Sequence, residues 1–284
     1  MGSTSPSAIS LLVRVACQTI AINSMERTLA QGQPSEKELE AAQQLLQKEA
    51  AEPLLWIALR GERAGMHRIV QYHDPGEFKS RELGLGNLYP NWLSAHYIKQ
   101  GHARLLRMMT ESVEIAQLPT EQHAPRFDEL ERTVQQESDA KNVGEALVGL
   151  LVPALGRIGE AYRRSQANLR CAYVALAAER YRLAHGRWPD SLDDLVAGDY
   201  LEKVPTDPCD GKPLRMRRLD DGLVIYSISF DGQDNSGKID RTKPATAPGI
   251  DLGFRLWDVA HRRQPAPELL RMPREEPGPP GDDK

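Results

Sequence analysis

The chain has 284 residues, of which 40% are hydrophobic and 27% charged, a composition typical of a globular protein with one large or two ordinary domains. Its 36 Lys and Arg residues against 40 Asp and Glu residues give a net charge of −4, which offers no electrostatic attraction for a nucleic acid. Three cysteines cannot make a complete disulfide framework, and the apolar helical patterns around Cys17 and Cys171 predict buried thiols, with Cys209 in a turn.

Residues 1–142 are predicted to be helical almost throughout. The first helix is indicated by an apolar stripe at helical spacing, which consists of Ile9, Leu12, Val13, Ala16 and Ile20. Gly32 is expected to end it. Ser35 and Glu38 then form a capping-box pattern, in which the hydroxyl and the carboxylate satisfy free amides at the start of a second helix.

Three further stretches in this half have helical character. Pro53 can open a helix that continues to Asp74-Pro75-Gly76, and another fits Trp92 to Gln117. The polar stretch from Phe127 to Asn142 has few apolar anchors, so it predicts either an exposed helix or a linker.

No stretch of the sequence has the roughly 18 to 20 uninterrupted apolar residues of a membrane-spanning helix. Ala8–Ile22 comes closest, but Arg14 and Gln18 interrupt it. The start, Met1-Gly2-Ser3, resembles one added to a shortened chain, and no signal-peptide pattern follows it. We therefore expect a membrane anchor upstream of Met1 in the full-length protein.

The second half begins with a long helix. An apolar helical pattern continues from Val143 to His185 without a strong breaker other than Pro153, which predicts a helix of roughly 40 residues and about 60 Å. Gly186 is expected to end it, and Trp188 is expected to fill the core between a following short helix and a sheet.

A small antiparallel sheet is predicted next. Apolar and basic residues alternate from Leu214 to Arg217, Asp221-Gly222 has the signature of a hairpin turn, and apolar residues alternate again from Val224 to Ile228. Asp251–Trp257 is expected to add a third strand.

These elements together predict an α+β fold with a mostly helical first half, a long central helix and a carboxy-terminal sheet of about three strands. We expect three regions along the chain: an all-helical region at 1–142, the long helix with the sheet at 143–263, and a Pro-rich disordered tail at 264–284.

The densest group of polar residues follows the second predicted strand, from Asp231 to Asp240. Its carboxylates, together with backbone carbonyls of a short glycine-containing loop, could supply the roughly six to eight oxygens that calcium requires. The spacing is not that of an EF-hand, and a solvated turn rich in Asp and Gly explains the same composition. The residues alone leave both interpretations open.

Residues 169–226 contain the most recognisable order of motifs in the chain. The run LRCAYVALAAERYRLAHGRWPDSLDDL passes into VPTDPCDGKPLRMRR and then LVIYSIS. This order resembles the soluble carboxy-terminal module of the major pseudopilins of bacterial type II secretion. In that family a long helix ending near Gly-x-Tyr/Trp-Pro leads through an Asp-Pro-x-x-Gly-x-Pro loop into a small antiparallel sheet, so the resemblance implies this fold for about a third of the chain.

The resemblance also implies a structural calcium ion. Major pseudopilins bind calcium in the loop after the corresponding strand, where a Leu-Gly-Ala-Asp-Gly run provides one carboxylate and backbone carbonyls. Residues 228–232, Ile-Ser-Phe-Asp-Gly, match that run, which makes Asp231 the implied carboxylate ligand and places Ile228 at its start. The candidates for closing the site are Asp234, Asp240 and Asp251. The ion would stabilise the fold rather than catalyse a reaction.

The whole chain also resembles a family of bacterial proteins in which a helical region precedes such a pseudopilin-like end. The phrases AEPLLWIALRGERA and DLGFRLWD are typical of it. A true pseudopilin instead has a Gly followed by Phe-Thr-Leu-Ile-Glu and about 20 apolar residues that span the membrane. The equivalent region here, Glu145–Leu155, is shorter and is preceded by a long helical region.

An enzyme has little support in the sequence. The one acid/base cluster worth weighing is formed by Glu62, His67, His73 and Asp74. No nucleophile motif, dinucleotide loop or Walker-type loop accompanies it.

We therefore expect a non-enzymatic structural or interaction protein of the bacterial cell envelope, on the periplasmic side, that binds other proteins. Nucleic acid is not expected as a partner, and the membrane is expected to be contacted through the upstream anchor. The alternatives are a component of a type II secretion or pilus-like machine, and an enzyme with its site in the helical half.

Overall fold

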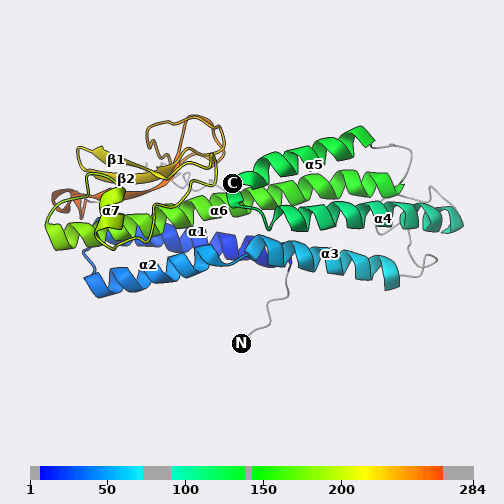
Figure 1. Cartoon of the computed structure of the whole chain (residues 1–284), viewed down its shortest axis with the longest axis horizontal. Coiled ribbons are helices and arrows are strands. Elements are labelled where there is room, and N and C mark those ends of the chain that lie inside the picture. The colour runs from blue at the N-terminus through cyan, green and yellow to red at the C-terminus, as the bar shows by residue number, and fades with distance from the viewer. Residues whose placement is uncertain (1–6, 73–90, 138–142, 265–284) are drawn as a thin grey trace, which may run out of the picture.

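The computed structural model describes residues 7–72, 91–137 and 143–264, and it confirms the predicted α+β fold. A long helix, α6 (Val143–His185), is accompanied along its length by other helices, and a small antiparallel sheet lies beside its carboxy-terminal half (Figure 1). The remaining helices are α1 (Ala8–Gln31), α2 (Glu36–Ala51), α3 (Leu54–Tyr72), α4 (Asn91–Ile115), α5 (His123–Glu137) and α7 (Asp193–Ala197). The strands are β1 (Arg215–Leu219), β2 (Gly222–Ser227) and β3 (Leu252–Trp257).

The central helix α6 has 43 residues, and its bounds agree with the sequence pattern. Pro153 lies inside it, at a position where proline removes one backbone donor from the helical ladder. Gly186 ends the helix with a φ of +71°, and its N–H donates to the carbonyl of Arg182 at 2.9 Å. Glycine adopts this left-handed conformation at little cost, so it fixes the point where the chain turns back toward the sheet.

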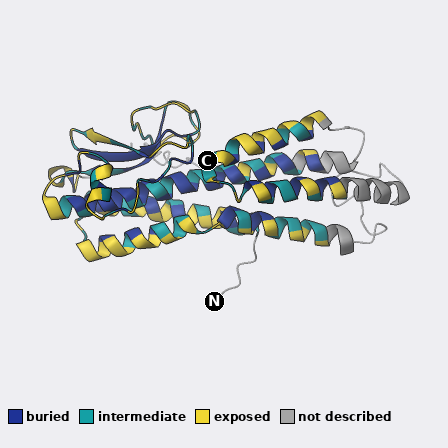
Figure 2. Cartoon of the chain, in the orientation of Figure 1, coloured by how far each residue is buried: buried dark blue, intermediate teal, exposed yellow. Residues whose placement is uncertain are grey.

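Two hydrophobic clusters lie along α6, and both include residues of this helix. The first joins its carboxy-terminal half to α1, α2 and the sheet, and its fully buried members include Leu169, Leu195, Leu223, Phe254 and Leu256. The second joins its amino-terminal half to α1, α3, α4 and α5, and its fully buried members include Leu55, Leu59, Ile115 and Leu130. The buried residues consequently follow α6 through the middle of the molecule (Figure 2).

The sheet has the order β1-β2-β3, with antiparallel pairing throughout. Strand β2 is buried along its whole length, because β1 and β3 flank it and α6 packs against the sheet. Gly222 opens β2 directly opposite Trp257, and a Cβ atom there would lie 2.0 Å from the carbonyl oxygen of Leu256. The predicted hairpin at Asp221-Gly222 and the predicted third strand are both present.

A buried ion pair ties the segment after the sheet to the helices. The side chain of Glu179 on α6 has no exposed surface, and it accepts hydrogen bonds from Arg182 at 2.7 Å and from Arg262 at 2.8 Å. Arg262 also donates to the carbonyl of Gly32, at the end of α1, at 3.1 Å. A carboxylate this deep requires compensating charge, so the end of the described chain is held against α1 and α6.

The helical half agrees with most of its predicted elements. The capping box is formed, because the Ser35 hydroxyl accepts from the Glu38 amide and the Glu38 carboxylate accepts from the Ser35 amide. Of the stretch left open as a helix or a linker, residues 127–137 belong to α5, and residues 138–142 lie outside the described residues. Cys17 was predicted to be buried, but it is exposed, because the side of α1 on which it lies faces solvent. The predicted helix end at residues 74–76 and the tail from 265 lie outside the described residues.

Candidate functional site

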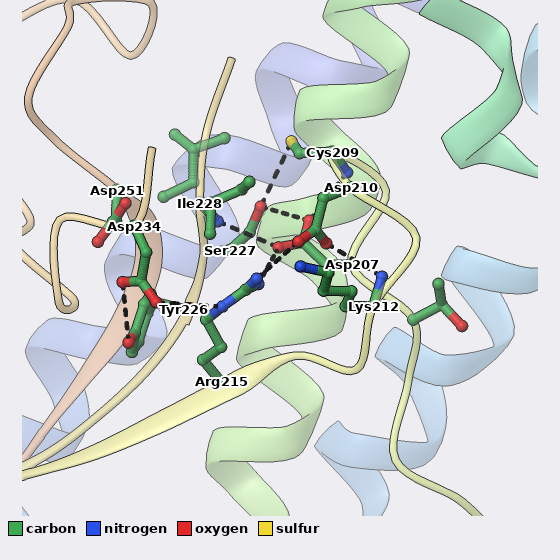
Figure 3. Close-up of polar contacts among 12 residues, drawn as sticks. Asp207, Cys209, Asp210, Lys212, Arg215, Tyr226, Ser227, Ile228, Asp234 and Asp251 are labelled. Carbon is green, nitrogen blue, oxygen red and sulfur yellow. Dashed lines mark hydrogen bonds and ion pairs between the residues drawn. The ribbon is translucent and has the colours of Figure 1, made fainter. Parts of the chain in front are cut away.

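The loop between α7 and β1 folds around a carboxylate, Asp207, whose side chain has no exposed surface (Figure 3). The backbone closes this turn, because the Asp207 amide donates to the Lys212 carbonyl at 2.6 Å and the Gly211 amide donates to the Asp207 carbonyl at 2.9 Å. Gly211 has a φ of +75°, a conformation that favours glycine. The Asp-Pro-x-x-Gly-x-Pro pattern is therefore a tight turn that holds the side chain of Asp207 inside the fold.

Four donors from three parts of the chain meet at the Asp207 carboxylate. One oxygen accepts the Ser227 hydroxyl at 2.7 Å and the Cys209 amide at 2.8 Å. The other accepts the guanidinium of Arg215 at 3.0 Å and the amide of Ile228 at 3.1 Å. Hydrogen bonds to a charged group contribute about 1.5–3 kcal/mol each, so this network joins the loop firmly to the end of β2.

Arg215 on β1 connects Asp207 to two further carboxylates. Its guanidinium donates to Asp210 at 2.6 Å, and its Nε lies 3.3 Å from Asp234. The Tyr226 hydroxyl also donates to Asp234, at 3.2 Å. Burial and the Asp234 carboxylate raise the pKa of Tyr226 to about 12, so the hydroxyl stays protonated and remains a donor at neutral pH.

Cys209 lies at the edge of this network. Its sulfur lies 3.4 Å from the hydroxyl oxygen of Ser227, whose one proton is donated to Asp207. Burial raises the pKa of the Cys209 thiol to about 11. The thiolate is the reactive form of cysteine, and at neutral pH this thiol stays protonated. The Asp207 network therefore organises a loop and supplies no activated nucleophile from Cys209.

The residues predicted to bind calcium lie in the long connection between β2 and β3. Asp231 accepts the Gly249 amide at 2.9 Å and the Gln233 amide at 3.0 Å, and these two bonds lower its pKa. Asp234, by contrast, is directed toward Tyr226 and Arg215 (Figure 3). The first two predicted carboxylates are thus satisfied by donors of the protein.

Asp251 is the buried carboxylate of this connection. It is 2% exposed, and it accepts the Gly237 amide at 2.7 Å and the Asn235 amide at 3.3 Å. Burial raises its pKa despite these two bonds. The side-chain amide of Asn235 also lies 3.4 Å from Asp231, so Asn235 links the two carboxylates at the start and the end of the connection.

The remaining predicted ligands have other partners. Asp240 accepts the Thr242 hydroxyl at 2.6 Å, and Ile228 donates its amide to Asp207. Within residues 7–72, 91–137 and 143–264, no three His, Cys, Asp or Glu side chains are grouped as metal ligands. Calcium binding by the connection stays a prediction.

The acid/base cluster considered for an enzyme is divided between different partners. Glu62 accepts the backbone amide of Ala8 at 2.7 Å. His67 instead stacks on His102, with its Nδ1 3.4 Å from the Nε2 of that ring. His73 and Asp74 lie outside the described residues. Neither a hydrogen bond nor an ion pair joins Glu62 to His67 in the described structure.

The apolar stripe of α1, defined by Ile9, Leu12, Val13, Ala16 and Ile20, faces solvent along its length. Ile9 is 74% exposed, Val13 58% and Ile20 66%. The opposite side of the helix faces α6, and its buried residues are Leu11, Gln18, Ile22 and Leu29. Because these positions differ by about half a helical turn from the stripe, α1 is apolar on two opposite sides.

A groove of about 500 Å³ extends beside the stripe, between the beginnings of α1 and α3. Ile9, Val13 and Cys17 line one side of it, and Leu54 and Ile57 line the other. By length and composition alone α1 could cross a membrane, since its most apolar stretch of 18 residues has a mean hydropathy of 1.4. In this fold its Gln18 is hydrogen-bonded to Ser165 of α6, so one side of the helix is used by the protein core.

The sequence pattern located the stripe but not its exposure. The five spaced apolar residues indicated a helix, and nothing in their spacing distinguishes a core-facing side from a solvent-facing one. A second set of apolar residues lies on the other side of the same helix and consists of Leu11, Ile22 and Leu29. This second set was the signal that one of the two apolar sides could face solvent.

Comparisons with protein-family models, with curated proteins and with solved structures found no match to this chain.

Proposed function

We propose that this chain is a non-enzymatic structural or interaction protein of the bacterial cell envelope, and that the apolar stripe of α1 binds an apolar helix of another protein. The observation behind this proposal is the exposure of Ile9, Val13 and Ile20 on the side of α1 opposite the core. Full burial of such a side chain contributes about 1.5–3 kcal/mol, so three of them leave a large unused driving force on one surface.

The shape of the surface favours a helix as the partner. Ile9, Val13, Ala16 and Ile20 are spaced i, i+4, i+7 and i+11, the spacing by which one helix contacts another. The adjoining groove between α1 and α3 extends the apolar surface to Ile57, which is 37% exposed. A helix laid along α1 would cover the stripe and reach into this groove.

The carboxy-terminal half supports a pseudopilin-like module as part of the proposal. Helix α6 ends at Gly186, and the chain then passes through α7 and the Asp207 turn into the antiparallel sheet, in the order expected from the resemblance. The amino-terminal half of α6 packs against α4 and α5. In a pseudopilin this half is the apolar spine of a filament, so its use in the core favours a stand-alone protein over a pseudopilus subunit.

The proposal is tested by placing a photo-crosslinking amino acid at Val13 in host cells, with the same group at exposed Arg217 of β1 as a control. The expected result is an adduct with one other protein at Val13. Reconstitution with that purified protein should then give an affinity that falls at least tenfold when Ile9, Val13 and Ile20 are changed to Glu.

A matched variant, Leu45→Glu on the solvent-facing side of α2, should retain the affinity, because Leu45 is 62% exposed but is not part of the stripe. Adducts solely with lipid or with a second copy of the chain would overturn the proposal. So would a Glu-substituted stripe that binds the identified partner as tightly as the original chain.

A further inference from the structure

A cavity of about 180 Å³ lies between α5 and α6. It shares no lining residue with the groove beside α1. From α5 it is lined by His123, Ala124, Phe127, Asp128 and Glu131, and from α6 chiefly by Gly156, Gly159, Glu160 and Arg163. Sites for drug-sized ligands measure roughly 300–1,000 Å³, so an occupant of this cavity must be a small molecule.

His123 lines the cavity and carries a buried hydrogen-bond acceptor. Its ring is 2% exposed, and its Nε2 donates to the carbonyl of Leu118 at 2.9 Å. Because a carbonyl can only accept, the proton is on Nε2 and the buried Nδ1 has a free lone pair. Nδ1 has no partner among the described protein atoms, and burial lowers the pKa of the ring, which keeps it neutral.

Arg163 gives the cavity a cationic donor. Its guanidinium stacks on the ring of Phe230 at 4.6 Å, and its buried Nε has no hydrogen-bond partner. Within the described part of the chain, Arg163 forms no ion pair, whereas Arg170, Arg180 and Arg182, further along α6, all have hydrogen-bonded partners. Glu160 and Asp128 lie near enough to act on its charge but form no ion pair with it, so the partly buried guanidinium can still bind an anion.

The other charges at the cavity restrict which anion fits. Asp128, Glu131 and Glu160 line it together with one further cation, Arg157. Three carboxylates repel a simple anion, whereas they attract a ligand whose anionic group is accompanied by a cationic one. We infer that the cavity binds a small zwitterion of the α-amino acid class, with its carboxylate on Arg163 and its ammonium group on His123 Nδ1 and the acidic side.

Two glycines of α6 line the cavity, and their surroundings differ. A Cβ atom at Gly159 would lie 2.7 Å from the ring of Phe127, so this glycine lets α5 approach α6 closely. A Cβ atom at Gly156 would meet nothing within 4 Å, so a side chain at this position has space to occupy. Gly156 therefore offers a way to fill the cavity without removing a polar group.

The inference is tested by calorimetric titration of the full chain with L-alanine as the probe, compared with acetate and ethylammonium. L-alanine is expected to bind at least ten times more tightly than either ion, since each ion uses one of the two charged sides. Arg163→Gln should weaken L-alanine binding at least tenfold, and Gly156→Leu should abolish it.

Gly149→Leu is the matched control, because Gly149 lies on α6, has the same open surroundings and does not line the cavity. It should bind L-alanine like the original chain. The inference is overturned if L-alanine does not bind at millimolar concentrations, if acetate binds equally well, or if folded Gly156→Leu retains binding. Because α1 does not line the cavity, the outcome of this titration and the outcome of the crosslinking experiment at Val13 do not depend on each other.

Discussion

Asp207 shows how one buried residue can hold together segments that are distant in sequence. Changing Asp207 to Ala would leave the hydroxyl of Ser227, two backbone amides and one arm of Arg215 without their acceptor. Removing one partner of a buried charged group costs roughly 3–5 kcal/mol. Arg215 keeps Asp210 as a partner, so we expect the free energy of unfolding to fall by about 3 kcal/mol, measured by urea denaturation.

The matched control is Asp220→Ala, because Asp220 is exposed in the hairpin between β1 and β2. Its free energy of unfolding should stay within about 0.5 kcal/mol of the original value. A loss below about 1 kcal/mol for Asp207→Ala would show that the network is not a main support of the module.

At this scale the sequence could predict the turn but not the network. The Asp-Pro-x-x-Gly-x-Pro motif predicts a turn at Asp207, because proline and glycine favour turns through their own backbone conformations. The partners Ser227 and Ile228 come some twenty positions later, in a strand that reaches Asp207 through the sheet. Contacts of this kind depend on tertiary packing, which no local pattern reports.

At the scale of the elements, the prediction of calcium binding by the connection between β2 and β3 can be tested directly. Asp251 is a buried carboxylate whose raised pKa shows that its two amide partners do not offset its loss of hydration. A calcium ion beside Asp231 and Asp251 would supply the missing positive charge. We therefore expect calcium at about 100 times its dissociation constant to stabilise the full chain by about 2.7 kcal/mol relative to chelator, measured as a rise in Tm of about 5 °C.

Replacing single Asp residues by Asn, which has nearly the same shape but no charge, tests which carboxylates bind calcium. Asp231→Asn and Asp251→Asn should each reduce the calcium-dependent rise in Tm, whereas Asp220→Asn should leave it unchanged. Equal melting temperatures in calcium and in chelator would contradict the calcium prediction and support the solvated-turn interpretation of this connection.

Helix α1 shows which element properties a pattern can predict. Helical spacing located it, because the period of apolar residues is a local property. The packing of α6 and α2 decides which of its two apolar sides faces the core. Gln18 forms hydrogen bonds with Ser165 of α6 and with Glu49 of α2. The exposure of Cys17 and of the stripe therefore could not be derived from spacing.

For the whole molecule, the important feature is that both hydrophobic clusters share α6. The sequence predicted a boundary at residue 142, between a helical region and the long helix with its sheet. Each cluster nevertheless contains residues from both sides of that position, because α1 and α2 pack on α6 near the sheet and α3, α4 and α5 pack on its other half. Dividing the chain at one residue cannot describe this packing, because α6 extends through both hydrophobic clusters.

A shared helix should make the molecule unfold as one unit. Phe254→Ala in the first cluster removes a fully buried ring and should cost about 3–5 kcal/mol, and Leu59→Ala in the second should cost about 2–5 kcal/mol. In variants that keep a single tryptophan, Trp56 on α3 or Trp188 near the sheet, either core substitution should shift the urea midpoint of both probes equally. If each substitution instead moves solely the probe in its own cluster, α6 does not couple the two cores and they unfold as separate units.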